Sequence, residues 1–296
     1  KRVLTLGWTH SRGSFISGCD QPFFSRTPCM VLRLATWNIN SVRLRMATVG
    51  RLVRQQNIDV LCLQETKVAD ASFPHKAIRK LGFEHVAING QKGYHGVAIL
   101  SRVPFTAIDA HDFCGKGDAR HLSVTLPGGI ELHNFYVPAG GDIPDVKLNA
   151  KYAHKLQFLE EMERFFAGMR DKRSAARIIV GDLNVAPFEH DVWSHKQLLN
   201  VISHTPAETE RMMRAYATHD WIDVTRSFVP AEQKVYSWWS YRNQDWKKSD
   251  RGRRLDHIWL SPALNGAVKS HEILKHVRDW KRPSDHVPVV AELEAN

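Results

Sequence analysis

The stretch "ARIIVGDLNVAPFEHD", residues 176–191, contains the segment that indicates the fold. Residues 178–180 form an apolar β-branched run, which is typical of a buried strand. This strand ends in Asp182 and, two positions later, Asn184. Taken alone, Asp182 is more typical of a turn or a helix cap. Whether the two polar side chains have a structural or a functional role therefore depends on which residues stand at the other strand ends.

Further apolar or alternating runs predict strands on both sides of this segment. They cover residues 31–39, 58–66, 95–101, 121–127, 130–138, 234–241, 253–261 and 287–294. Apolar residues at helical spacing predict helices over 40–56, 150–169, 191–199 and 207–216. Because strands occur in groups as well as alternating with helices, a doubly wound parallel sheet fits poorly. The order favours an α/β fold with two mixed sheets and outer helices.

Size and charge limit the class of protein. The chain has 296 residues with 43% hydrophobic residues, enough for a sizeable core, and a formal net charge of +10. A basic balance favours partners that carry phosphates, although a merely basic protein fits the charge as well. The four cysteines show no CxxC spacing, which is typical of a reducing compartment. No apolar run reaches the length of a membrane span, so a soluble, cytoplasmic protein is expected.

The first 29 residues differ from the rest of the chain. They lack the apolar core of a signal peptide and the period of an amphipathic helix, so that a transit peptide is the less favoured alternative for this segment. The strand pattern begins immediately after Met30. We therefore expect an N-terminal extension over residues 1–29 and one domain over residues 30–296.

Strand after strand ends in an acid, an amide or an imidazole. The set comprises Asn38, Glu65, Tyr136, Asp182, Asn184, Asp256, Asp285 and His286. Side chains at the ends of neighbouring strands project from a rigid sheet into one shared site at the sheet edge. Carboxylate oxygens suit a hard divalent cation, and an Asp–His pair can hold a charged imidazole next to a phosphate. Each residue alone is explained as well by a purely structural role, such as a turn, a cap or a local ion pair. The joint pattern indicates chemistry on a phosphate.

Eight motifs in order resemble one known family. They are "TWNINSVR", "DVLCLQETK", "QKGYHGVAILSR", "NFYVPAGG", "GDLNVAP", "YSWWSYR", "RRLDHIWLS" and "RPSDHVPV". From about Met30 to the C-terminus, the chain resembles the exonuclease III and AP endonuclease branch of the endonuclease/exonuclease/phosphatase superfamily. The resemblance implies a four-layered α/β sandwich, with two mixed β-sheets packed face to face and helices outside. It also implies an enzyme that uses Mg²⁺ or Mn²⁺.

The activity implied by the resemblance is DNA repair. Such an enzyme cuts duplex DNA on the 5′ side of abasic sites and removes nucleotides or blocking groups from 3′ ends. Its partners would be duplex DNA with abasic sites or blocked 3′ ends, and one compact active site suits a monomer. Two alternatives remain: a non-catalytic DNA-binding relative, and a phosphoesterase of the same superfamily that acts on lipid or inositol phosphates.

The resemblance also assigns roles around the metal. Glu65 is implied as the main ligand, assisted by Asn38 and Asp285. The expected set around the metal further includes Asp182, Asn184 and His286.

The catalytic roles implied by the resemblance concern the water and the phosphate. Asp182 would orient or deprotonate the attacking water, while Asn184 and Tyr136 would contact the scissile phosphate. Asp256 would pair with His286, which would stabilise the transition state.

Substrate recognition is expected in the segment "YSWWSYRNQDWKKSDRGRR", which mixes aromatic and basic residues. By the resemblance, Trp238 and Leu255 would form walls of a pocket for a flipped abasic sugar. Arg242, Arg253 and Lys67 would bind the DNA. Some relatives carry a bulky apolar residue where this chain has Arg253.

Overall fold

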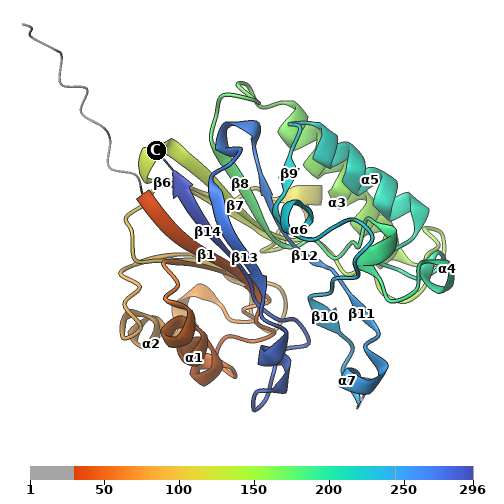
Figure 1. The fold of residues 1–296 in the computed structure, drawn as a ribbon, viewed down its shortest axis with the longest axis horizontal. Coiled ribbons are helices and arrows are strands. Elements are labelled where there is room, and N and C mark those ends of the chain that lie inside the picture. Colours follow the sequence, from red (N-terminus) through yellow and green to blue (C-terminus); the bar gives the residue numbers. More distant parts are fainter. Residues whose placement is uncertain (1–29, 244, 296) are drawn as a thin grey trace, which may run out of the picture.

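The computed structural model describes residues 30–243 and 245–295. The predicted extension over residues 1–29 lies outside the described residues, and the division of the chain into an extension and one domain stays a prediction. Two six-stranded mixed sheets form the centre, with helices on both outer sides (Figure 1). The predicted α/β sandwich of two face-to-face sheets is confirmed.

The first sheet has the order β13-β14-β1-β2-β4-β3. Strands β1 and β2 are parallel, whereas β14 is antiparallel to β1. Its strands are β1 Met30–Asn38, β2 Val60–Gln64, β3 His85–Asn89, β4 Val97–Ser101, β13 Val268–Ile273 and β14 Val289–Ala295.

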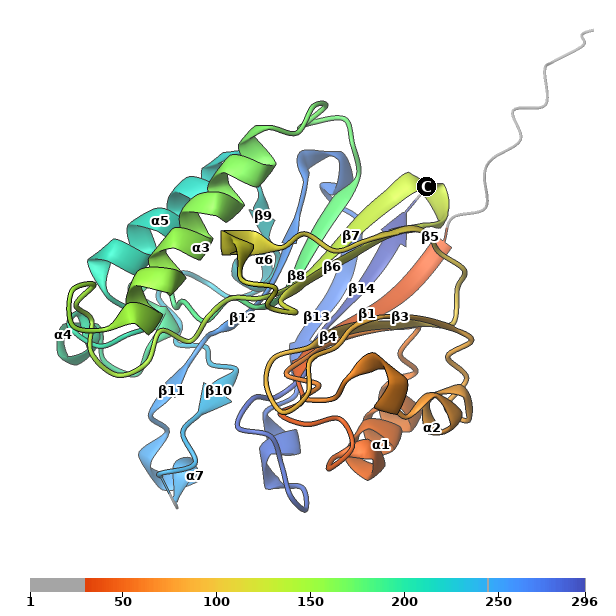
Figure 2. The same cartoon turned by 180° about the vertical axis from the view of Figure 1, so that it is seen from behind.

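The second sheet has the order β5-β6-β7-β8-β12-β9. Strands β7 and β8 are parallel, and β12 is antiparallel to β8. Its strands are β5 Thr106–Asp109, β6 His121–Leu126, β7 Ile130–Tyr136, β8 Arg177–Asp182, β9 Ile222–Asp223 and β12 Asp256–Leu260. A separate pair of short strands, β10 Trp238–Trp239 and β11 Gly252–Arg253, extends from the sandwich (Figure 2).

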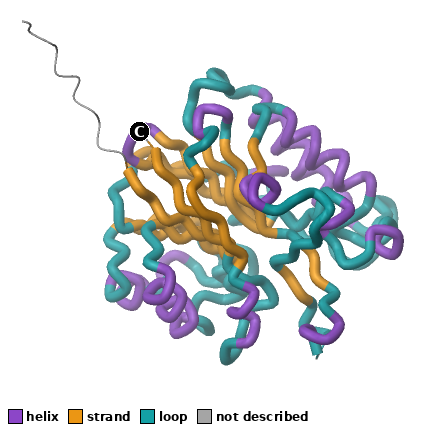
Figure 3. Tube along the Cα trace, in the orientation of Figure 1, coloured by secondary structure: helices purple, strands orange, loops and turns teal. Residues whose placement is uncertain are grey.

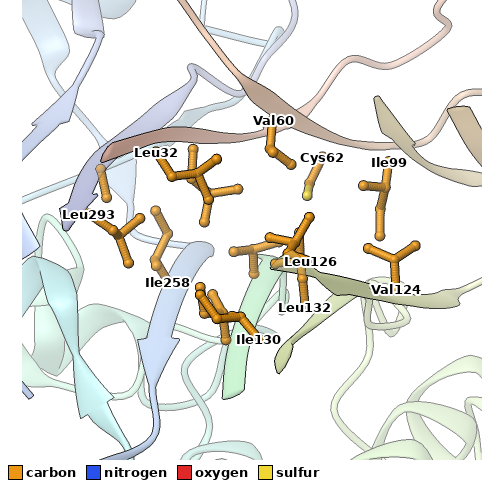
Figure 4. Packing of buried hydrophobic residues seen from close by; sticks show 14 of the residues in the cluster. Leu32, Val60, Cys62, Ile99, Val124, Leu126, Ile130, Leu132, Ile258 and Leu293 are labelled. Carbon is orange, nitrogen blue, oxygen red and sulfur yellow. The ribbon is translucent and has the colours of Figure 1, made fainter. Parts of the chain in front are cut away.

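The inner faces of the two sheets share one hydrophobic core (Figure 4). Val60, Cys62 and Ile99 come from the first sheet, and Leu132 and Ile258 come from the second. All five side chains are buried, including the cysteine that the sequence placed in a strand. Burial of these apolar faces against each other is the main favourable term for closing the sandwich.

Helices cover the outer faces of both sheets (Figure 3). On the first sheet, α1 and α2 pack against residues such as Trp37, and on the second, α3 and α5 pack against residues such as Ile179 and Trp259. The helices are α1 Met46–Gln56, α2 His75–Arg79, α3 Ala150–Ala167, α4 His195–Leu198, α5 Pro206–Ala217, α6 Val224–Phe228 and α7 Trp246–Ser249.

Several element boundaries differ from the sequence prediction. The helix expected over 40–56 begins only at Met46, and the one expected over 191–199 is reduced to His195–Leu198. The eight-residue strand expected over 234–241 is wrong, because only Trp238 and Trp239 pair, with β11. The strand expected over 253–261 is divided into β11 and β12. Strands β3, β5, β9 and β13 were not predicted; each lies at a sheet edge, and β5 and β13 bury no residue fully.

Candidate active site

Six of the predicted site residues lie along one edge of the sandwich. Asn38, Tyr136 and Asp182 end strands β1, β7 and β8. Asp256 begins β12, which is antiparallel to β8, so that Asp256 pairs directly with Asp182. Glu65 directly follows β2, and His286 precedes β14, which runs antiparallel to β1. These side chains are therefore fixed by strand ladders rather than by free loops.

Three hydrogen bonds between side chains of these six residues cross from one sheet to the other. Asn38 Nδ2 donates to Asp182 Oδ2 at 2.9 Å, and the Tyr136 hydroxyl donates to Glu65 Oε1 at 2.8 Å. His286 Nδ1 lies 2.8 Å from Asp256 Oδ2. The candidate site is thus the polar seam where the two sheets meet.

The Asp182 carboxylate is the centre of the seam. It is 1% exposed and accepts hydrogen bonds from the Asn184 backbone N–H at 3.0 Å and from the Asn184 side chain at 3.0 Å. Burial raises the pKa of Asp182 to about 7, against the opposing effect of His286. Leu183 points to the other side, into the cluster beneath α3, as strand alternation predicts. A carboxylate that titrates near neutral pH can accept a proton from water.

His286 lies between two carboxylates. Its Nδ1 contacts Asp256, and its Nε2 lies 3.6 Å from Asp182 Oδ2. Burial acts to lower the pKa of His286, but Asp256 and then Asp182 outweigh it and raise the pKa to about 10. Asp256 is itself held by the Ser237 hydroxyl, which donates to Oδ2 at 2.6 Å. The imidazole is therefore a charged donor at neutral pH.

Glu65 shares the Asn38 side-chain amide nitrogen with Asp182 as a hydrogen-bond donor. Its Oε1 accepts from Asn38 at 2.9 Å as well as from Tyr136, and its Oε2 lies 2.8 Å from the Lys67 ammonium. Burial acts to raise the pKa of Glu65, but the charge of Lys67 and these hydrogen bonds lower it. Glu65 is thus an ionised carboxylate, and its negative charge favours the binding of a cation.

The donor set fits a hard divalent cation. Asn38 Nδ2 donates to both the Glu65 and the Asp182 carboxylates and so brings them together, and carboxylate oxygens are what Mg²⁺ prefers. The Asn38 Oδ1 accepts from the Asn40 backbone N–H at 3.1 Å. Among the described residues, the three groups that lie near enough to share a metal are Asp182, Asp256 and His286. A protonated imidazole has no free lone pair, however, so His286 would have to lose a proton before it could bind a metal.

The partners of the Asp285 carboxylate differ from those of the Glu65 carboxylate. Its Oδ2 accepts from Trp238 Nε1 at 3.0 Å, and its Oδ1 accepts from Asn40 Nδ2 at 3.2 Å. Lys67 Nζ also donates to Asn40 Oδ1, at 2.6 Å. The structure therefore links Asp285 directly to Trp238. Through Asn40 it also links Asp285 to Lys67, which contacts Glu65.

A cavity of about 930 Å³ opens over the seam. It is lined by site residues together with four of the five predicted DNA-binding residues, namely Trp238, Arg242, Arg253 and Leu255. Lys67 is not among the lining residues and contacts Glu65 instead. No helix among the described residues is long and apolar enough to cross a bilayer.

A buried ion pair that was not predicted contacts the backbone of Asn184, which lines the cavity. Lys155 of α3 pairs with Glu208 of α5, and both side chains are fully buried. The Lys155 ammonium donates to the Asn184 carbonyl at 2.7 Å. The only sequence signal was a lysine on the apolar face of the helix over 150–169, which shows no partner by itself. The pair fixes the backbone of a predicted site residue.

Comparisons with known proteins agree with this geometry. A family model described as the Endonuclease/Exonuclease/phosphatase family matches residues 35–286. The chain is 29% identical over 274 residues to exodeoxyribonuclease III from Haemophilus influenzae, covering 89% of this chain and 100% of that protein.

Solved structures are similar over the same span. An AP endonuclease from Archaeoglobus fulgidus has a TM-score of 0.82 at 30% identity, covering 89% of this chain and 100% of that one. The 3′ phosphatase NExo from Neisseria, bound to a product DNA hairpin, has a TM-score of 0.82 at 28% identity, with the same coverage of both chains. The chain therefore belongs to the endonuclease/exonuclease/phosphatase family, in its exonuclease III and AP endonuclease branch of hydrolytic nucleases.

Proposed function

We propose that this protein is a metal-dependent DNA repair nuclease. It hydrolyses the phosphodiester bond 5′ to an abasic site in duplex DNA and also acts on 3′ ends as an exonuclease and end-cleaning enzyme. The observation that carries the proposal is the geometry of the seam, where His286 lies 2.8 Å from Asp256 and 3.6 Å from Asp182. The opposite environments of the two groups, with a pKa of about 7 for Asp182 and about 10 for His286, are consistent with it. Two adjacent groups whose pKa values are pushed apart are suited to act as base and acid.

Asp182 accepts a proton from the attacking water in this proposal. Its two amide partners, Asn38 and Asn184, fix the direction in which the carboxylate faces. Because these partners are neutral, they orient the carboxylate without supplying the full charge that would lower its pKa strongly.

His286 donates to a phosphoryl oxygen as negative charge develops. Asp256 holds the ring in one orientation and keeps it protonated. In this proposal the phosphate is also contacted by the Tyr136 hydroxyl, which donates to Glu65 in the structure, and by the Asn184 amide, which donates to Asp182. Positioned donors of this kind stabilise the transition state of phosphoryl transfer more than the ground state.

Glu65, with Asn38 and Asp182, would hold Mg²⁺ or Mn²⁺. When bound, the cation would neutralise the phosphate charge and stabilise the leaving oxygen. Roles for Asn184, Asp285 and His286 as metal ligands stay predictions, as do the monomeric state and the cytoplasmic location. The relatives' names support DNA as the substrate, because those proteins are exodeoxyribonucleases, AP endonucleases and a 3′ phosphatase.

A labelled duplex with one abasic analogue tests the proposal. In Mg²⁺ we expect one incision on the 5′ side of the analogue, leaving a 3′-hydroxyl, and we expect none in EDTA. Hydrolysis of an inositol phosphate, assayed in parallel, would indicate the alternative, a phosphoesterase of the same superfamily. Binding of the duplex without incision or 3′ trimming would indicate the non-catalytic relative and contradict the proposal.

A further inference from the structure

Three loops that line the active-site cavity share one buried support. They follow β7, β8 and α4, and they contribute Ala139, Asn184 and Ser203, respectively, to the cavity lining. The ion pair between Lys155 of α3 and Glu208 of α5 is fully buried, and it forms hydrogen bonds to all three loops. Neither member of the pair is among the residues that line the cavity.

The lysine of this pair contacts the first two loops. Lys155 Nζ donates to the Asn184 carbonyl at 2.7 Å and to the Ala139 carbonyl at 3.4 Å. The aliphatic part of the side chain lies against Gly140, where an added Cβ would be 2.9 Å from Lys155 Cδ. The ammonium therefore joins two loops that leave the neighbouring parallel strands β7 and β8.

The glutamate contacts the third loop. Its carboxylate accepts from the Ser203 backbone N–H at 2.9 and 3.0 Å, and from the Thr205 backbone N–H at 3.1 Å and hydroxyl at 2.6 Å. Ser203 has φ +85°, a conformation that few residues other than glycine adopt. Because hydrogen bonds to an ionised group are stronger than neutral ones, Glu208 stabilises this conformation of the loop.

The conformation of Asn184 determines whether its amide reaches the Asp182 carboxylate. Asn184 has φ +53°, in the left-handed region. In this conformation its backbone N–H and its side-chain amide both donate to Asp182 at 3.0 Å. The bond from Lys155 orients the Asn184 carbonyl and so opposes the backbone rotation that would move the amide away from Asp182.

Packing of α3 against α5 does not by itself require an ion pair. Replacing a buried ion pair by uncharged residues of similar volume is often neutral for stability, because the cost of removing two charges from water offsets their attraction. Lys155 and Glu208 add directional hydrogen bonds to the backbone of the loops. Their specific effect is therefore on the geometry of the cavity.

We propose that Lys155 and Glu208 are positioning residues for the hydrolysis, which hold the three loops so that Asn184 keeps the Asp182 carboxylate directed at the attacking water. The inference rests on the proposed function and deepens it, because it assigns control of the rate to two residues that do not touch the substrate. Loss of the pair should lower the rate of the chemical step more than the affinity for DNA.

The test removes both charges together. Lys155→Met/Glu208→Gln leaves no unpaired buried charge, and the glutamine keeps an oxygen acceptor for the loop N–H groups. We expect an unfolding midpoint in urea close to that of the wild type, a single-turnover incision rate on an abasic duplex at least about tenfold lower, and a Kd changed less than about threefold. A wild-type rate, or equal losses of rate and affinity, would overturn the inference. No incision by the wild type would instead contradict the proposed nuclease.

A second variant keeps the test decisive if the first does not fold. In Lys155→Gln/Glu208→Gln the two amides can hydrogen-bond to each other. The side chain at position 155 is then one bond shorter than lysine and no longer reaches the Asn184 carbonyl. The same loss of rate is expected, and a wild-type rate would refute the role of Lys155.

Another ion pair between the same two helices provides the matched control. Arg211 of α5 pairs with Glu160 of α3 at 2.8 Å, and both side chains are partly exposed and lie outside the cavity. Arg211→Met/Glu160→Gln should leave the incision rate within about twofold of the wild type. An equal fall in this control would show that any loosening of the two helices slows the reaction, which would refute the positioning role.

A double-mutant cycle shows whether the buried pair acts through Asn184. In an Asn184→Ala background, Lys155→Met/Glu208→Gln should lower the rate by a factor at least about threefold smaller than in the wild type, because the amide that the pair positions is gone. Equal factors in the two backgrounds would show that the pair does not act through Asn184, contrary to the inference.

Discussion

At the scale of single residues, the Asp182 carboxylate shows how burial and hydrogen bonding compete. Three N–H groups donate to it, which favours the ionised form, yet burial still raises its pKa to about 7. The same seam raises the pKa of His286 to about 10. Both shifts require neighbours that are distant in sequence, so the sequence indicates the residue types but not their protonation.

These two pKa values predict the pH dependence of kcat/KM. Activity should rise with pH through about 7, as Asp182 loses its proton, and fall through about 10, as His286 loses its proton. In Asp256→Asn both limbs should move to lower pH, because the Asp256 carboxylate raises the pKa of both groups.

The measurement is the pH profile of incision of an abasic duplex at constant Mg²⁺ concentration, since a bound cation itself lowers the pKa of a nearby carboxylate. An alkaline limb that stays in place in Asp256→Asn would show that Asp256 does not control His286.

Glu65 gives a second prediction at this scale. Glu65→Ala removes the ionised carboxylate between Asn38, Tyr136 and Lys67. Because this carboxylate is the expected main ligand, the Mg²⁺ concentration for half-maximal activity should rise at least about tenfold. A Mg²⁺ titration of incision checks this, and Lys92→Ala, an exposed residue outside the cavity, is the control. An unchanged titration in Glu65→Ala would remove Glu65 from the metal site.

At the scale of elements, the strands buried on both faces could be predicted and the edges could not. Every residue of β2, β8 and β12 is buried, so these strands consist mainly of apolar residues. Such runs can be recognised in the sequence. Strand β13, Val268–Ile273, carries exposed Lys269, Ser270 and Glu272, and it becomes a strand only because β14 supplies the partner. The run around Trp238 looked like a long strand because aromatic residues favour strands, but its partner β11 has only two residues.

The close contact between β7 and β8 predicts a sensitive glycine. Gly181 has φ +140°, and a Cβ there would lie 2.0 Å from the Phe135 carbonyl oxygen. Gly181→Ala should therefore lower the free energy of unfolding by about 3 kcal/mol. Urea unfolding measures this loss.

Gly266→Ala is the matched control for this prediction. Gly266 also has a positive φ, +77°, but nothing lies within 4 Å of its added Cβ. It should therefore show only the conformational cost of about 1 kcal/mol. Equal losses in the two variants would mean that the Phe135 contact relaxes without cost.

At the scale of the whole molecule, the active site exists only when the two sheets are packed together. Asn38, Glu65 and His286 come from the first sheet or its adjoining segments, while Tyr136, Asp182 and Asp256 come from the second. The sequence placed all six at strand ends, and the structure brings them to one seam. The resemblance implied the Asp256–His286 pair, but the sequence could not reveal the Asn38–Asp182 hydrogen bond or the Lys155–Glu208 ion pair, because these depend on contacts between distant parts of the chain.

The net charge of +10 belongs to this scale as well, since it favours DNA binding independently of the catalytic seam. Binding and chemistry should therefore be separable. Asp182→Asn removes the proton acceptor and leaves the basic surface unchanged.

The single-turnover incision rate of Asp182→Asn on an abasic duplex, with the Kd for the same duplex measured in parallel, tests the central claim most directly. We predict a rate at least about 100-fold below that of the wild type, the range for loss of a general base, with Kd changed less than about threefold. A folded Asp182→Asn variant that cleaves at the wild-type rate, or that loses affinity as much as rate, would contradict the assignment of Asp182 as the residue that activates water.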